Sequence, residues 1–256
     1  MGVLNVTPDS FSDGGRWLGR DAAIAHGMAM VAAGADVIDV GGESTRPGAR
    51  PVDADEECRR VVDVVGALAP SVRVSIDTRK AAVAEAAVAA GATIVNDVSA
   101  SLWPVAASTG AGWIAMHMRG DPATMQQLAD YEDVVADVSG FLVERAQQAR
   151  DGGVGEIWID PGIGFAKTAA HNLSLLRHLD RLVATGWPVV VGTSRKSFLG
   201  PLAVTPGEAP APSDDRLEGS LASAVWASMQ GAGMVRVHDV APTAQALKVL
   251  GAPVAP

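Results

Sequence analysis

The chain has 256 residues, of which 48% are hydrophobic, so it is long enough to bury one large core. It carries 29 acidic and 20 basic side chains, and the net charge of -9 argues against a nucleic-acid or anionic-membrane partner. Cys58 is the single cysteine, which excludes an intramolecular disulfide and favours a cytoplasmic location, and no apolar stretch is long enough to predict a membrane span.

Short β-branched segments alternate along the chain with Ala-rich segments of helical composition. Strands are expected at residues 2–6, 36–40, 72–76, 93–97, 113–116, 156–160, 188–192 and 234–238. Helices are expected at residues 21–33, 54–69, 79–90, 132–152, 171–185, 216–231 and 242–250, and residues 99–110 leave room for a helix of a turn or two. This alternation predicts a single-domain α/β fold over residues 1–256, the (β/α)8 TIM barrel.

Glycines at the ends of three expected helices support this interpretation. Gly34, Gly91 and Gly231 each lie where a helix would give way to a strand, and glycine adopts the left-handed conformation of a helix end at little cost. Residues 203–215 are rich in Pro and acidic residues instead, which predicts a flexible surface loop and no second domain.

Polar side chains follow almost every expected strand, where a TIM barrel builds its active site. Each has a structural explanation too, since Asp77 can cap a helix, Asp160 can begin a turn and Arg236 can form an ion pair. Together they bring carboxylate, amide, guanidinium, imidazole and ammonium groups to one end of the barrel, which is therefore the predicted active site. They are Asn5, Glu43, Thr45, Arg46, Asp77, Asn96, Asp97, Met116, His117, Asp160, Arg195, Lys196, Arg236 and His238.

The glycine-rich segment at residues 162–168 invites comparison with a phosphate-binding P-loop. A P-loop has glycine directly before its lysine, whereas Ala166 precedes Lys167, so the match fails. The segment is better interpreted as a loop between a strand and a helix, in which Phe165 is available to stack on a flat ligand.

Nine strings of the sequence closely resemble the motifs of the dihydropteroate synthase family. They are MGVLNVTPDSFSDGG, VIDVGGESTRPGA, SIDT, NDVS, MHMRGDPATMQ, DPGIGFAKT, VGTSRKSFLG, RLEGSLA and RVHDV. The resemblance spans nearly the whole chain. It implies a TIM-barrel transferase of folate biosynthesis, usually a homodimer, that joins 6-hydroxymethyl-7,8-dihydropterin diphosphate to p-aminobenzoate and is the target of sulfonamides.

The resemblance implies a pterin site with a chemical reason for each main residue. Asp160 would accept from the amino group and a ring N–H of the pterin, and Asn96 would donate and accept along the same edge. Asp77 would accept from a further ring N–H, while Lys196 would donate to the opposite side. Further pterin contacts are implied at Met116, Phe165 and Gly192.

The diphosphate leaving group is implied to lie near Asn5, Thr45, Arg46, Arg236 and His238. Cationic and imidazole side chains together with Mg²⁺ suit a departing polyanion. Asn5 would be the one protein ligand of Mg²⁺, so phosphate and water would supply most of its coordination.

The p-aminobenzoate site is implied to form when two loops close. Phe11 and Pro47 would pack the ring, with Thr45 beside it, and Ser197 would receive the carboxylate at a helix N-terminus. Asp13 would lie near the developing positive charge. Catalytic roles are implied for Asp13, Lys196, Arg236 and His238, and residues 9–15 are expected to form a mobile lid.

Two other interpretations stay open on the sequence alone. A pterin- or folate-binding methyltransferase-type barrel would share the acidic and amide groups but has no use for the DSFSDGG and SRKS elements. A non-catalytic paralogue would be expected to lack Asp160 or Lys196, and both are present.

Overall fold

The computed structural model describes residues 1–7, 15–44, 51–121, 124–205 and 207–251. Within these ranges the strands confirm the predicted series. One parallel sheet contains β1 (Gly2–Asn5), β2 (Val37–Gly41), β3 (Arg73–Asp77), β4 (Ile94–Asp97), β5 (Gly112–Met116) and β6 (Ile157–Asp160) in that order, and β7 (Val190–Val191) pairs in parallel with β8 (Met234–Val235).

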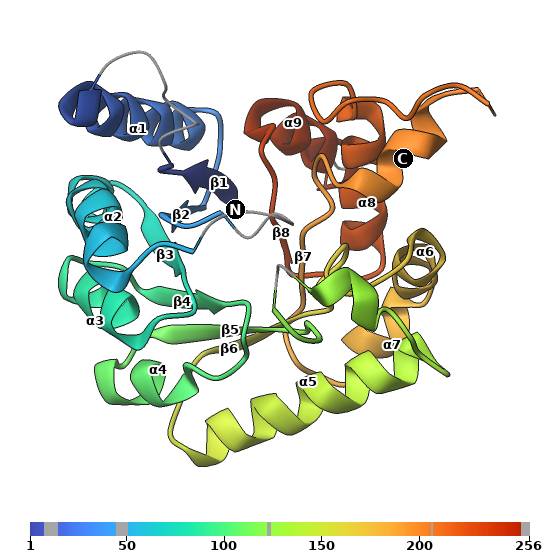
Figure 1. The fold of residues 1–256 in the computed structure, drawn as a ribbon, viewed down its shortest axis with the longest axis horizontal. Helices are drawn as coiled ribbons and strands as arrows, with labels where there is room; N and C mark the ends of the chain where they lie inside the picture. The colour runs from blue at the N-terminus through green and yellow to red at the C-terminus, as the bar shows by residue number, and fades with distance from the viewer. Residues whose placement is uncertain (8–14, 45–50, 122–123, 206, 252–256) are drawn as a thin grey trace.

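Backbone contacts at two seams join these sheets into a closed barrel. On one side, Ile159 of β6 forms a parallel bridge with Val189, the residue before β7. On the other side, Gly2 of β1 forms a parallel bridge with Val237, and the N–H of Val3 donates to the Val237 carbonyl at 2.9 Å. The strands therefore form a ring inside the helices, and the predicted TIM barrel is confirmed (Figure 1).

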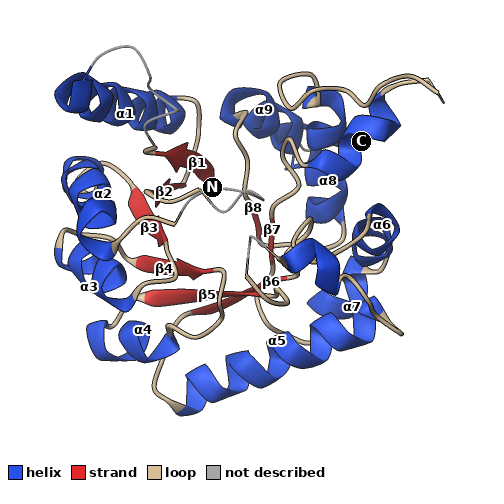
Figure 2. Ribbon diagram, viewed as in Figure 1, coloured by secondary structure: helices blue, strands red, loops and turns tan. Residues whose placement is uncertain are grey.

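Helices surround the strands, as Figure 2 shows. They are α1 (Gly15–Ala32), α2 (Ala54–Leu68), α3 (Ala81–Ala89), α4 (Trp103–Thr109), α5 (Val134–Asp151), α6 (Ala169–Arg177), α7 (Leu179–Val183), α8 (Leu217–Met229) and α9 (Val240–Gly251). The short α4 agrees with the prediction for residues 99–110. The helix expected at residues 171–185 is instead two helices, because the backbone leaves helical geometry at His178 (φ −111°, ψ 30°). No helix in the described ranges is long and apolar enough to cross a bilayer.

The predicted helix ends and the Pro-rich stretch can also be placed. Gly34, Gly91 and Gly231 all have positive φ, between 94° and 117°, as expected of glycines that end helices. Beyond the short 3-10 helix Ser197–Ala203, the described residues up to position 215 form neither helix nor strand and are mostly exposed.

The barrel interior has an apolar layer directly beneath the polar end. Val37, Ile94 and Ile114 belong to one buried cluster, together with Met1 and Val190. Side chains two residues apart on a strand point to the same face. Asp39, Asn96 and Met116 therefore lie on the same face as Val37, Ile94 and Ile114, one step nearer the carboxyl ends of the strands.

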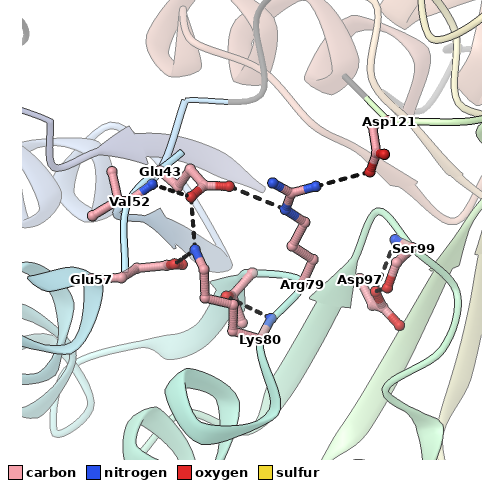
Figure 3. Close-up of polar contacts among 9 residues, drawn as sticks. Glu43, Val52, Glu57, Arg79, Lys80, Asp97, Ser99 and Asp121 are labelled. Atoms are coloured by element: carbon pink, nitrogen blue, oxygen red, sulfur yellow. Dashed lines mark hydrogen bonds and ion pairs between the residues drawn. The ribbon is translucent and has the colours of Figure 1, made fainter. Parts of the chain in front are cut away.

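Asp97 takes the opposite face from its neighbour Asn96 and is a structural residue. Its carboxylate accepts hydrogen bonds from Ser99 (backbone N–H 2.9 Å, hydroxyl 2.5 Å), from the N–H groups of Ser101 (2.7 Å) and Leu102 (2.6 Å) and from the Trp113 indole (3.2 Å). The contact with Ser99 is drawn in Figure 3. Because Asp97 is fully buried, these donors must compensate for the loss of its hydration. The carboxylate therefore fixes the turn that leads into α4.

Replacing Asp97 by Ala is expected to lower the free energy of unfolding by about 3 kcal/mol, because several buried donors would lose their common acceptor. Ser99→Ala, which removes a single hydroxyl, is expected to cost about 1 kcal/mol. Urea denaturation followed by circular dichroism measures both. Equal stability of Asp97→Ala and the unmodified chain would contradict this role.

Candidate active site

Five predicted site residues lie along one edge of the barrel, at the carboxyl ends of its strands. Asn5 of β1 and Asp77 of β3 are both in register with the last residue of β2. Asp77 is in turn in register with Asn96 of β4, and Met116 of β5 with Asp160 of β6. The predicted gathering of these side chains at one end is therefore confirmed.

Arg236, which follows β8, lies at the centre of a polar network on this edge. Its Nη2 donates to Asp77 Oδ2 at 2.6 Å, and its Nε donates to Asp39 Oδ2 at 2.6 Å. The Asn96 Nδ2 donates to the same Asp39 oxygen at 3.0 Å. The guanidinium thus links β8 to β2 and β3, and Asp39 links β2 to β4.

Asp39 is a site residue that the sequence reasoning missed. It lies within β2 rather than after it, so a search of the residues that follow each strand passes over it. It is fully buried, and its Oδ1 has no hydrogen-bond partner among the described residues. The available signal was a carboxylate inside an otherwise apolar strand, which must be paired to stay buried.

Burial and neighbouring charges shift the ionisation of this network. The pKa of Asp77 is raised to about 7, chiefly by burial, which Arg236 opposes and Asp39 reinforces. Burial lowers the pKa of Arg236, but the two carboxylates outweigh this effect and raise it, so the guanidinium stays charged. Asp77 is therefore an acceptor that takes up a proton near neutral pH.

Asp160 is 6% exposed at the end of β6, and its Oδ1 accepts from the Gly162 N–H at 2.7 Å. Burial raises the pKa of Asp160, while Lys196 and the Gly162 hydrogen bond lower it. The carboxylate is thus oriented by the backbone of the loop that follows it.

Lys196 and Phe165 lie together, as their predicted roles require. The Lys196 Nζ is 4.8 Å from the centre of the Phe165 ring and donates to the Ile163 carbonyl. A Cβ at Gly192 would lie 3.8 Å from this Nζ and 3.6 Å from the Arg236 Cβ, so a side chain here would contact both residues. Burial lowers the pKa of Lys196 to about 8, although Asp160 acts to raise it.

The ends of β7 and β8 meet through His238. Its ring Nδ1 lies 3.1 Å from the Ser194 hydroxyl, which also accepts from the His238 backbone N–H at 3.1 Å. Ser197 is exposed and begins the 3-10 helix Ser197–Ala203, and its role in binding a carboxylate stays a prediction.

Glu43 anchors the start of the loop between β2 and α2 (Figure 3). Its Oε2 accepts from the Lys80 ammonium at 2.7 Å and from the Val52 N–H at 2.8 Å, and its Oε1 accepts from the Arg79 guanidinium at 3.2 Å. Burial acts to raise the pKa of Glu43, but Lys80 and the other donors lower it overall. The carboxylate therefore links Glu43, which precedes the undescribed residues 45–50, to Val52, which follows them.

Five predicted site residues lie outside the described residues, as does most of the lid expected at residues 9–15. They are Phe11, Asp13, Thr45, Arg46 and Pro47. Their roles stay predictions.

The described residues contain no group of three or more His, Cys, Asp or Glu side chains that could hold a metal ion. Asn5 offers an amide oxygen at the end of β1, which is the hard oxygen that Mg²⁺ prefers. The nearby Asp39 and Asp77 each bond Arg236. This donor set fits an ion that takes most of its ligands from phosphate and water.

The geometry suits a flat heterocycle that carries an anionic group. Asp77, Asn96 and Asp160 provide acceptor oxygens, and Lys196 provides donors beside an aromatic ring. Arg236 and His238, which both follow β8, add a cation and an imidazole.

Known proteins are similar to this chain in sequence and fold. A family model described as pterin binding enzyme matches residues 1–238. The dihydropteroate synthase of Mycobacterium leprae is 49% identical over 261 residues, which cover 98% of this chain and 92% of that relative.

Two solved structures agree with this relationship. The dihydropteroate synthase of Xanthomonas albilineans with 4-aminobenzoic acid matches with a TM-score of 0.89 and 45% identity, covering 98% of this chain and 91% of that one. The Yersinia pestis enzyme in a sulfonamide drug complex matches with a TM-score of 0.89 and 44% identity, covering 98% and 92%. The chain therefore belongs to the pterin binding enzyme family, and within that family to the dihydropteroate synthases.

Proposed function

We propose that the chain condenses 6-hydroxymethyl-7,8-dihydropterin diphosphate with p-aminobenzoate to give 7,8-dihydropteroate and diphosphate. The observation that carries this proposal is the meeting of Asp77, Asn96 and Asp160 with Lys196 and Arg236 at one end of the barrel. Relatives that bind 4-aminobenzoic acid or a sulfonamide drug support it.

The acceptor groups would hold the pterin ring by its donor edge. An ionised Asp160 can accept from the amino group and a ring N–H at once, which is the paired geometry that a carboxylate favours. Asn96 would bind the same edge, and its amide is held by the hydrogen bond that Asp39 accepts from its Nδ2. The Lys196 ammonium would donate to the opposite edge, with Phe165 stacked beside the ring.

Bond breaking would precede bond formation. The C–O bond between the pterin methylene and the diphosphate breaks, and its electron pair leaves on the diphosphate oxygen. The pterin ring stabilises the resulting cation, and the arylamine nitrogen then attacks the methylene carbon and loses a proton. Arg236 and His238 would stabilise the charge that develops on the leaving group.

Mg²⁺ is proposed as the metal cofactor. Asn5 would hold it through the amide oxygen, and a bound ion would supply charge stabilisation for the departing diphosphate. Arg236, which stays charged beside two carboxylates, would add a second positive centre on the protein side.

The p-aminobenzoate half of the site is proposed from Ser197 and four of the undescribed residues. Ser197 would receive the carboxylate, Phe11, Thr45 and Pro47 would pack the ring, and Asp13 would lie near the cation. A sulfonamide would occupy the same place as p-aminobenzoate and compete with it.

The proposed reaction is tested by measuring diphosphate release from the pterin diphosphate with and without p-aminobenzoate and Mg²⁺. Sustained release is expected to require both p-aminobenzoate and Mg²⁺, because p-aminobenzoate consumes the cation that bond breaking forms, and a sulfonamide is expected to compete with p-aminobenzoate. Asp160→Asn is expected to lower the rate roughly 100-fold, because an amino group replaces one acceptor oxygen. Release that ignores p-aminobenzoate would indicate a hydrolase, and pterin binding with no release at all would indicate a non-catalytic paralogue.

The kcat/KM for the pterin diphosphate is expected to give a bell-shaped pH profile. As pH falls through about 7, Asp77 takes up a proton and no longer accepts, so the rate falls. As pH rises above about 8, Lys196 loses its proton and donates less well, so the rate falls again. Lys196→Arg, which stays charged, should move only the alkaline limb to higher pH. A flat profile across both values would contradict these assignments.

A homodimer is proposed from the exposed apolar side chains of two neighbouring helices. Trp226 and Met229 of α8 are 41% and 63% exposed, and Val249 and Leu250 of α9 are 74% and 43% exposed. Large apolar side chains that stay exposed on neighbouring helices are available to an interface. Light scattering is expected to give twice the 26.2 kDa mass of one chain, and a monomer mass would contradict the proposal.

A further inference from the structure

Lys167 is a buried lysine that the proposed reaction does not use. Only 3% of the residue is exposed. The Nζ donates to the carbonyls of Phe165 at 2.9 Å, Gly162 at 3.0 Å and His117 at 3.3 Å, and it lies 3.0 Å from the His117 Nδ1. A buried ammonium group has three protons to place, and here acceptors surround it.

These contacts connect two neighbouring strands of the barrel. His117 directly follows β5, and residues 161–167 follow β6. Burial lowers the pKa of His117 to about 3, so its ring is neutral and can accept through Nδ1. Burial also lowers the pKa of Lys167 to about 7, although Asp160 acts to raise it.

Gly162 joins this cation to the carboxylate proposed to bind the pterin. Its carbonyl accepts from Lys167, and its N–H donates to Asp160 Oδ1 at 2.7 Å. The residue has φ +63°, and a Cβ there would lie 1.9 Å from the His117 carbonyl oxygen. The peptide group before Gly162 is therefore held by Asp160, and the peptide group after it is held by Lys167.

The same short segment also supports the other side of the pterin pocket. The Ile163 carbonyl accepts from Lys196, and the Gly164 N–H donates to Asn172 Oδ1 of α6 at 2.7 Å. Phe165 carries both a carbonyl bound to Lys167 and the ring that lies beside Lys196. Gly162 and Gly164 thus anchor the segment, whereas Ile163 and Phe165 contact Lys196 in the pocket.

We propose that Lys167 is a positioning residue for the pterin ring. It holds residues 162–165 in place, so that Asp160 and Lys196 stay where they can bind the edges of the ring and Phe165 stays where it can lie against its face. Lys167 itself does not touch the substrate. The inference deepens the proposed function and rests on it, because it takes the pterin as the ligand of Asp160.

The test is the affinity for 6-hydroxymethylpterin, measured by calorimetry in the absence of p-aminobenzoate. This ligand lacks the diphosphate and therefore reports on the ring pocket alone. Lys167→Met is expected to raise the Kd roughly tenfold, since small displacements of binding groups have effects of this size or larger. Lys80→Met, which removes a partly buried lysine paired with Glu43 and Glu57, is the matched control and should leave the Kd unchanged.

Steady-state kinetics separate positioning from a loss of folded protein. In Lys167→Met, the KM for the pterin diphosphate is expected to rise by the same factor, with the KM for p-aminobenzoate unchanged at saturating pterin diphosphate. A preparation that is only partly folded would show a lower apparent kcat and both KM values unchanged, and that result would overturn the proposal.

Lys167→Arg keeps the positive charge, but the donors of a guanidinium group lie in one plane. They cannot reach the three carbonyls that are arranged around the Lys167 Nζ. This variant is expected to fold and to raise the 6-hydroxymethylpterin Kd by a smaller factor. If Lys167→Met does not fold and Lys167→Arg binds as tightly as the unmodified chain, the lysine serves folding alone and the inference is wrong. A chain that binds 6-hydroxymethylpterin yet forms no dihydropteroate would refute the proposed reaction and leave this test valid.

Discussion

The ion pairs of Arg236 are the interaction on which the polar end of the barrel depends. Asp39 and Asp77 lie close together with little access to water, and two carboxylates in such a place repel each other. The guanidinium group contacts both, so one cation compensates two charges and links β8 to β2 and β3. Removing one partner of a buried pair leaves an uncompensated charge, which is costlier than the pair itself is favourable. The position of Asn96 follows from this arrangement, because Asp39 accepts from Arg236 and Asn96 at the same oxygen.

Strand periodicity explains how a mostly apolar barrel can present so many polar groups at one end. Asn96 and Asp97 are neighbours in sequence, yet one faces the barrel interior and the other is bound by the turn before α4. An apolar layer around Ile94 and Ile114 closes the interior beneath the site. The polar groups therefore lie on an apolar layer of low dielectric constant, which strengthens their electrostatic effect on a bound charge.

Much of the fold and part of the site could be predicted from the sequence because both depend on local patterns. The alternation of β-branched and Ala-rich segments locates the strands, and the residue that ends each strand gives Asn5, Asp77 and Asp160. Asp39 and Lys167 escaped because their roles depend on partners distant in sequence. Asp39 acquires its role from Arg236, and Lys167 from His117. A helix break such as the one at His178 likewise depends on how the chain packs, which residue periodicity does not reveal.

Closure of the barrel has a consequence for how the chain folds during synthesis. The last strand, β8, supplies the neighbour of the first strand, β1, through the pairing of Gly2 with Val237, and the Met1 amino group donates to the Val235 carbonyl at 3.0 Å. The ribosome makes β1 long before β8. Until β8 emerges, β1 keeps an open edge of unpaired backbone groups, which is a template for pairing with other chains. The nascent chain therefore carries this open strand edge from the synthesis of β1 until that of β8.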